Sequence, residues 1–126
     1  MSDIQFITTD KAPIPLGHYS QATVYNGTVY VAGQLGIYPN DPKHVGSIEE
    51  QTEQALTNVR EILVTAGSDL NKLLKVTIFI SDIAYWAPVN AVYIKMLKDH
   101  KPARAIVPVN ELPQGFHIEI DAIAAV

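Results

Sequence analysis

The order of apolar and polar residues along the chain predicts paired strands followed by amphipathic helices. Two stretches rich in β-branched and aromatic residues, residues 20–25 and 28–33, flank the dipeptide Asn26-Gly27. Asn and Gly tolerate the positive φ angles of a type I′ turn, so we expect these stretches to form an antiparallel hairpin. The next stretch, residues 33–46, is rich in Gly and Pro and has no apolar period, which predicts a loop.

A helical period follows that loop. Ser47 and Glu50 have the spacing of a capping box, and apolar residues then recur every three or four positions up to Gly67. These signals predict an amphipathic helix over residues 48–66 that ends at Gly67. The polar residues of this segment, Asn58 among them, are expected mostly on its solvent-facing side.

The second half of the chain alternates between strand and helix patterns. Residues 73–81 are β-branched and aromatic with little polarity, which favours a central strand covered by the first helix. Helical spacing of apolar residues predicts a second helix over about residues 86–100. Two closing strands, residues 103–109 and 117–126, are separated by the turn-rich segment NELPQG.

The resulting order is three strands, a helix, a strand, a helix and two strands, βββαβαββ, in one domain that spans residues 1–126. We expect an α+β fold in which both helices pack on one face of the sheet. The other face then needs a cover, which association with other subunits would supply.

Composition narrows the function classes. The formal net charge is -4 with only nine Lys plus Arg, so the chain offers no basic stripe for nucleic acid or an anionic membrane. The absence of cysteine excludes disulfides and thiolate chemistry, and four scattered histidines argue against a metal site. No segment approaches the roughly 18 apolar residues of a membrane span. We therefore expect a cytoplasmic protein.

Two charges stand out in the closing strands, Arg104 and Glu119, because their neighbours are mostly apolar. A hairpin of these strands is one arrangement that could bring the two side chains together. One interpretation is a buried or interfacial ion pair, which costs desolvation without necessarily adding stability. The other is a site in which Arg104 holds an anion through two parallel hydrogen bonds and Glu119 remains free for proton transfer. From spacing alone the ion pair is favoured.

Other candidate residues are weaker when taken singly. Tyr19, in the segment GHYSQA, either belongs to a polar turn or offers its hydroxyl and ring to a ligand pocket. The segment VAGQLG does not match a nucleotide-binding loop. Asn90 is most simply an exposed residue of the second helix.

Taken in order, these motifs resemble the Rid family of reactive intermediate deaminases, also called the YjgF family. The segments that carry the resemblance are GHYSQA, VYVAGQLG, LLKVTIFISD, VNAVY and PARAIV…LP…HIEIDAIA, which together span nearly the whole chain. The resemblance implies a chorismate-mutase-like fold and a homotrimer, with a central β-barrel, outer helices and clefts between subunits. It also implies hydrolysis of 2-imino acids, such as 2-iminobutanoate and 2-iminopropanoate, to 2-keto acids and ammonia without metal or cofactor.

The resemblance also implies roles for individual residues. Arg104 matches the arginine that binds the substrate carboxylate, and Glu119 matches the glutamate that holds and activates water. Tyr19 matches the pocket tyrosine, Gly33 a glycine whose backbone lies beside the ligand, and Asn90 a helix asparagine near the cleft.

Three positions depart from the family pattern. This chain has His18, Ala32 and Ile106 where active deaminases commonly have Pro, Ser and Cys. We expect Ile106 to line the substrate site, keeping a backbone hydrogen bond while its side chain narrows the pocket. The departures leave open a second hypothesis, a trimer that binds a small carboxylate or keto acid without turning it over. An endoribonuclease or translation inhibitor is a third, which the acidic balance disfavours.

Overall fold

The first three strands are β1 (Gln5–Ile7), β2 (Ala22–Tyr25) and β3 (Thr28–Leu35), seen in a computed structural model that describes residues 3–126. They pair antiparallel in chain order. Asn26 and Gly27 join β2 to β3 with φ angles of 49° and 77°, the left-handed conformations that the predicted turn requires. The hairpin is confirmed, but β3 extends past the predicted end at Gly33, which therefore lies inside the strand.

Helix α1 (Ile48–Thr65) begins and ends where the sequence predicted. The Ser47 hydroxyl accepts a hydrogen bond from the Glu50 amide at 3.1 Å, and the Ser47 amide donates to the Glu50 carboxylate at 2.9 Å. Gly67 follows the helix with a φ of 89°, a conformation that glycine adopts without a Cβ penalty. The capping box therefore fixes the start of the helix and the glycine its end.

Asn58 is not on the solvent-facing side of α1, as predicted, but fully buried. Its side-chain amide donates to the carbonyl oxygens of Leu35 and Ile37 at 3.1 and 2.9 Å. Buried backbone carbonyls need hydrogen-bond donors, and the Asn58 amide supplies one to each of these two at the end of β3 and just beyond it. Asn58 thus ties the end of β3 to the helix.

The second half contains β4 (Leu73–Ile80), α2 (Trp86–Leu97), β5 (Ala103–Pro108) and β6 (Ile118–Ala125), with short 3₁₀ helices at Leu70–Lys72, Ile83–Tyr85 and Pro113–Gly115. The predicted order of main elements is confirmed. Helix α2 ends earlier than expected, because Lys98 has a φ of 56° and leaves the helical conformation.

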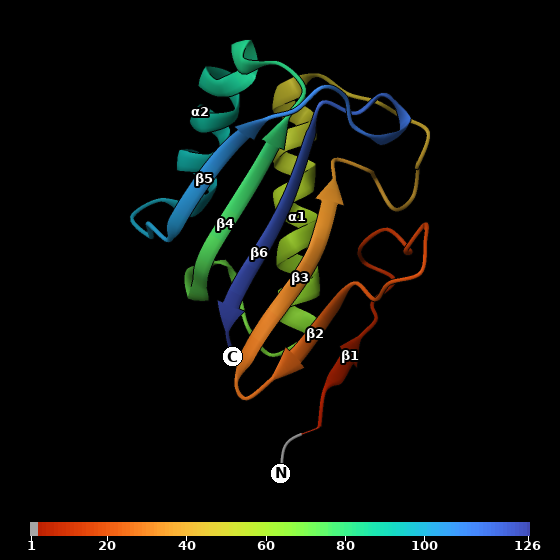
Figure 1. Ribbon diagram of the computed structural model, residues 1–126, viewed down its shortest axis with the longest axis vertical. Coiled ribbons are helices and arrows are strands. Elements are labelled where there is room, and N and C mark those ends of the chain that lie inside the picture. Colours follow the sequence, from red (N-terminus) through yellow and green to blue (C-terminus); the bar gives the residue numbers. More distant parts are fainter. Residues whose placement is uncertain (1–2) are drawn as a thin grey trace.

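The strand order in the sheet is β1-β2-β3-β6-β4-β5 (Figure 1). The expected hairpin of the two closing strands is therefore wrong: β5 pairs only with β4, in parallel, and β6 lies between β3 and β4, antiparallel to both. The physical reason is the crossover through α2, which returns the chain parallel to β4 and leaves β5 at the sheet edge. The central position goes to β6, which buries every second residue completely or nearly so under the helices.

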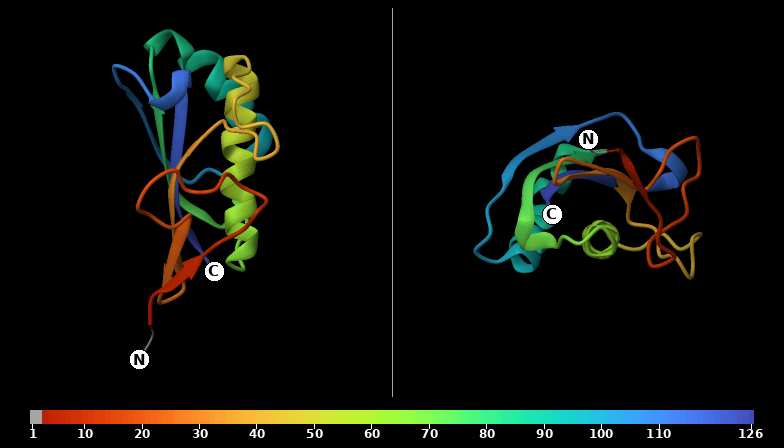
Figure 2. Two further views of the ribbon diagram at one scale, coloured as in Figure 1. Left: turned by 90° about the vertical axis from the view of Figure 1, so that its right-hand side faces the viewer. Right: turned by 90° about the horizontal axis from the view of Figure 1, so that it is seen from below.

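Both helices cover the same face of the sheet (Figure 2), as the sequence predicted. On β6 the buried face carries Ile118, Ile120, Ala122 and Ala124, and the half-buried residues between them point to the opposite face. That open face carries Tyr30 of β3, which is 47% exposed. The single α+β domain is thus one layer of helices on one sheet, and its uncovered face is available for association.

Candidate functional site

Arg104 and Glu119 lie far apart within one chain. Arg104 stands opposite Val76 of β4, whereas Glu119 stands opposite Phe79 of the same strand, which separates β5 from β6. Two strand spacings across and three residues along give a backbone separation of about 14 Å. An odd number of positions also places the two side chains on opposite faces of the sheet. An Arg104–Glu119 ion pair within a single chain is therefore excluded.

Arg104 lies on the helix side of the sheet, where α2 holds its guanidinium in place. Its Nη1 donates to Oδ1 of Asn90 at 2.8 Å. The guanidinium also stacks over the ring of Tyr93, 4.7 Å from its centroid, and lies 5.9 Å from the ring of Trp86. Cation–π contacts and one hydrogen bond use only part of a guanidinium's five donors. Arg104 is thus fixed in orientation with N–H groups left for a ligand.

A cavity of about 580 Å³ opens beside this guanidinium, between α2 and the start of β5. Arg104, Asn90 and Tyr93 all line it. We call it the arginine cavity. Within the described chain, no Asp or Glu is among the residues that line this cavity. The guanidinium of Arg104 therefore has no carboxylate partner there and can bind an anionic ligand.

Glu119 lines a second cavity, of about 450 Å³, together with Tyr19, Ala32 and Gly33. We call it the glutamate cavity. A Cβ at Gly33 would overlap Oε2 of Glu119 and lie 2.9 Å from its Cδ. The register of β3 against β6 shifts between Val31 and Gln34, which places Gly33 at an irregularity beside this carboxylate. The Glu119 carboxylate therefore occupies the space that a side chain at position 33 would take.

The environment of Glu119 favours its protonated form. Burial raises the pKa of its carboxyl group, and the negative charge of Asp121 on the same face of β6 raises that pKa further. The pKa of Asp121 is itself raised by burial, against the opposing effects of a hydrogen bond with Thr77 and the positive charge of Lys75. A carboxyl group whose pKa lies above its ordinary value is suited to proton transfer nearer neutral pH.

Tyr19 forms part of the wall of the glutamate cavity. Its side chain is 49% exposed, and its hydroxyl accepts a hydrogen bond from the Leu16 amide at 3.3 Å. Ala32, one of the three departures from the family pattern, also lines this cavity, whereas His18 is exposed and does not. The position at which active deaminases commonly carry a Ser hydroxyl thus lines the same cavity as Glu119.

Ile106 lines neither cavity. It follows Arg104 by two positions, so its side chain points to the same helix-covered face, opposite Ile78 of β4. There it packs against the hydrophobic core. The structure therefore divides the predicted residues into Arg104 with Asn90 and Glu119 with Tyr19 and Gly33. The half-buried side chain of Ile106 packs against the core and lines neither cavity.

Two neighbours of these groups were not among the predicted site residues. Tyr93 lies under Arg104, and Asp121 acts electrostatically on Glu119. Tyr93 follows Asn90 by three positions, and residues three apart on a helix share a face, so the spacing in VNAVY was the available signal. For Asp121 the signal was the two-residue spacing from Glu119 on one strand.

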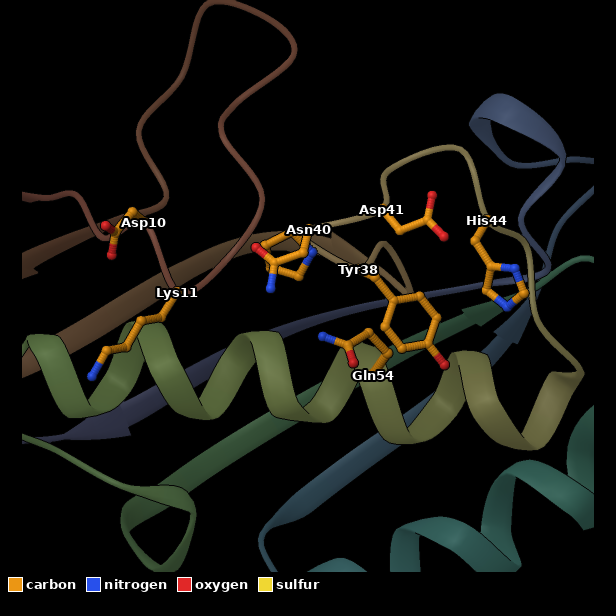
Figure 3. Close-up of a pocket in the computed structure, with 8 residues that line it drawn as sticks. Asp10, Lys11, Tyr38, Asn40, Asp41, His44 and Gln54 are labelled. Atoms are coloured by element: carbon orange, nitrogen blue, oxygen red, sulfur yellow. The ribbon is translucent and has the colours of Figure 1, made fainter.

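A larger cavity, of about 720 Å³, lies elsewhere (Figure 3). Asp10 and Lys11 stand at one end of it, while Tyr38 and His44 stand near the other with ring centroids 5.4 Å apart. No predicted site residue lines it. Choosing the candidate site by cavity volume alone would therefore miss Arg104 and Glu119, the residues that can bind an anion and transfer a proton.

The described residues also bear on other site types. Between residues 3 and 126, no group of three or more His, Asp or Glu side chains is placed to hold a metal ion. Neither helix there has the length and apolar character needed to cross a membrane.

Comparison with known proteins gives full-length matches. The chain is 43% identical over 121 residues to the 2-iminobutanoate/2-iminopropanoate deaminase of Bos taurus, covering 95% of this chain and 88% of that protein. It superposes with a TM-score of 0.93 on Escherichia coli TdcF with bound serine, at 32% identity and with 97% and 98% of the two chains covered. The E. coli YjgF gene product gives a TM-score of 0.92 at 33% identity, with 96% and 98% covered.

The family comparison agrees with these matches. The model of the family described as endoribonuclease L-PSP matches residues 9–126. This range contains all the residues that line the arginine cavity and the glutamate cavity. The chain belongs to the endoribonuclease L-PSP family, the Rid or YjgF family that its sequence motifs predicted.

Proposed function

We propose that this protein hydrolyses small 2-imino acids, such as 2-iminobutanoate and 2-iminopropanoate, to 2-keto acids and ammonia. The observation that carries the proposal is the pair of complementary sites: a fixed guanidinium with free N–H donors, and a carboxyl group of raised pKa in a cavity. An anionic 2-imino acid needs one group to hold its carboxylate and another to manage protons. The name of the bovine relative supports this substrate class.

The proposal requires an oligomer, because one chain cannot bring Arg104 and Glu119 to the same small molecule. Arg104 lies on the edge strand β5, and Glu119 lies on the open face of the sheet. If the edge of one subunit packs against the open face of the next, Arg104 of one chain meets Glu119 of another. In a closed ring every subunit supplies both halves. We therefore propose a homotrimer with three identical clefts.

The reaction follows from these groups. Arg104 holds the substrate carboxylate through two parallel hydrogen bonds. Glu119, as carboxylate, accepts a proton from water while the water oxygen bonds to the imine carbon, and it returns that proton to the nitrogen, which gives a 2-amino-2-hydroxy acid. Glu119 then takes the proton of the new hydroxyl group and passes it to the amino nitrogen as the C–N bond breaks, so that the keto acid forms and ammonia leaves. Water and the imine supply every atom of both products, and Glu119 returns to its starting state.

The remaining residues take supporting roles in this proposal. Asn90 orients the guanidinium through its hydrogen bond. Gly33 leaves room for the Glu119 carboxylate and presents backbone to the ligand. Tyr19 walls the cleft. We expect the Ile106 backbone to offer a further hydrogen bond, while its half-buried side chain packs against the core.

The experiment generates 2-iminobutanoate with a threonine dehydratase or an amino-acid oxidase and follows its decay with and without the protein. Micromolar protein is expected to accelerate the decay, and the Arg104→Ala variant is expected to lose that acceleration. No acceleration by the wild-type protein, or full activity in Arg104→Ala, contradicts the proposal.

A second candidate is a trimer that binds a small keto acid without turnover. Ala32 favours it, because a residue that lines the glutamate cavity lacks the hydroxyl common in active deaminases. It predicts that 2-oxobutanoate raises the melting temperature while 2-iminobutanoate decays at its spontaneous rate. Turnover by the wild-type protein rejects this candidate.

A further inference from the structure

The arginine cavity carries more positive charge than one carboxylate requires. Of the nine Lys and Arg residues in the chain, three line it: Lys98, Lys101 and Arg104. The chain as a whole has a formal net charge of -4. Gathering cations around one concave surface in an acidic protein creates a local field that attracts anions.

The segment between α2 and β5 presents these lysines. Lys98 leaves the helix with φ 56° and ψ -120°, a conformation that residues other than glycine rarely adopt, and its amide donates to the Ile94 carbonyl at 2.8 Å. Lys101 precedes Pro102, which restricts the backbone of both residues. His100 lies between the lysines, with Nε2 2.8 Å from the Leu73 carbonyl. The backbone that carries the lysines is therefore held at several points.

Lysines at the end of a helix also have a simpler explanation, since positive charge compensates the helix dipole. That explanation accounts for Lys98, which directly follows α2. It does not account for the cavity, or for the absence of any Asp or Glu among the described residues that line it.

Tyr93 adds an independent observation. It lines the arginine cavity and is only 7% exposed, and its hydroxyl is the one buried side-chain polar atom without a hydrogen-bond partner in residues 3–126. Buried hydroxyl groups normally have a partner, and each exception calls for an explanation such as an ordered water or a ligand. The wall of the arginine cavity therefore holds a polar group with unused hydrogen-bonding capacity, although the hydroxyl itself is covered by its neighbours.

We propose that the arginine cavity binds a second anionic group, so that the substrates of this protein include 2-imino acids with an acidic side chain. Arg104 holds the carboxylate next to the imine, and Lys98 and Lys101 face the second acid group. The cavity of about 580 Å³ lies within the range that binds small organic molecules and leaves space for the longer dianion. This inference rests on the proposed function.

The test compares a monoanion with a dianion of the same product class. Calorimetry measures the affinity of the wild-type protein for 2-oxobutanoate and 2-oxoglutarate at low and at high salt. The dianion is expected to bind about 10-fold more tightly at low salt, and this preference is expected to shrink as salt screens the lysines. The double substitution Lys98→Gln and Lys101→Gln is expected to lower the preference about 5-fold or more.

The matched control is Lys72→Gln, which removes the same charge from an exposed position that lines neither cavity. It is expected to leave the preference at the wild-type value. Equal affinities for the two keto acids, or a preference that survives the double substitution, overturn the inference. Decay assays with 2-iminobutanoate test the proposed function separately. A protein that hydrolyses this imine but shows no dianion preference retains the function and loses the inference.

Discussion

The arginine cavity and the glutamate cavity are built by different means. In the arginine cavity, neighbouring side chains position the functional group: Asn90 accepts its hydrogen bond and Tyr93 lies under its plane. In the glutamate cavity, the absence of a side chain does the positioning, because Glu119 occupies the space that a Cβ on Gly33 would take. Arg104 is held by contacts with neighbouring side chains, whereas Glu119 lies in space that the lack of a side chain at Gly33 leaves open.

The difference is also electrostatic. No carboxylate lines the arginine cavity within residues 3–126, so its cation has no negative partner there. The glutamate cavity combines burial with a second negative charge, Asp121, and both raise the pKa of Glu119. One cavity is therefore suited to holding an anion and the other to exchanging a proton. Neither alone suffices for imine hydrolysis, which is why their meeting between subunits is central to the proposed function.

The largest expected effect comes from replacing the guanidinium. Arg104→Lys keeps the charge but removes the planar fork and its geometry toward Asn90 and the substrate. We expect kcat/KM for 2-iminobutanoate to fall about 100-fold or more, since two charge-assisted hydrogen bonds are lost. Steady-state kinetics check this. Wild-type kcat/KM in Arg104→Lys would show that charge alone anchors the substrate.

An intermediate effect is expected from filling the space beside Glu119. Gly33 does not have a positive φ, so Gly33→Ala tests space and not backbone strain. The new methyl group displaces the Glu119 carboxylate, and we expect kcat to fall about 10-fold, with only a small loss of stability, because the methyl group meets the end of a flexible side chain and not the backbone. Kinetics and thermal unfolding measure both quantities.

The control for that substitution is Gly27→Ala in the hairpin turn. Gly27 has a φ of 77° and nothing within 4 Å of an added Cβ, so an alanine there strains the backbone without touching either cavity. This variant is expected to lose stability and keep its kcat. Equal losses of kcat in both variants would attribute the effect of Gly33→Ala to instability.

The smallest effect is expected from Asp121→Asn. In the proposed reaction Glu119 must be a carboxylate to accept a proton from water, so activity falls as pH drops through its raised pKa. Removing the negative charge of Asp121 lowers the pKa of Glu119, and the acid limb of the pH–kcat profile is expected to move to lower pH. Burial is the larger cause of the raised pKa of Glu119 and is unchanged in this variant, so the expected shift of the acid limb is modest. Glu49→Gln, on the exposed side of α1, is expected to leave the limb in place. A limb that moves to higher pH in Asp121→Asn contradicts the assignment.

Local signals in the sequence predicted local structure well. The Asn-Gly turn, the capping box at Ser47 and the stop at Gly67 each involve residues close in the chain, and all are confirmed. Asn58 was misplaced because helical periodicity treats every polar residue as solvent-facing. Its burial depends on two carbonyls more than twenty positions away.

Strand order could not be predicted in the same way. The insertion of β6 between β3 and β4 pairs strands that are far apart in the chain, and no local pattern in the sequence specifies such a pairing. The hairpin expectation followed chain proximity and so placed Arg104 beside Glu119. Motif resemblance identified both residues as site candidates, but their separation onto opposite faces emerges only from the register.

The central claim is that Arg104 and Glu119 act together across a subunit boundary, and mixing inactive variants tests it most directly. Arg104→Ala and Glu119→Gln are each purified, dissociated, mixed in equal amounts and reassembled, and 2-iminobutanoate decay is then measured. Random mixing in a cyclic trimer leaves about one quarter of the clefts with both intact residues, so we predict recovery to about a quarter of wild-type activity. Activity that stays at the level of the separate variants, in samples shown to have exchanged subunits, would contradict the claim.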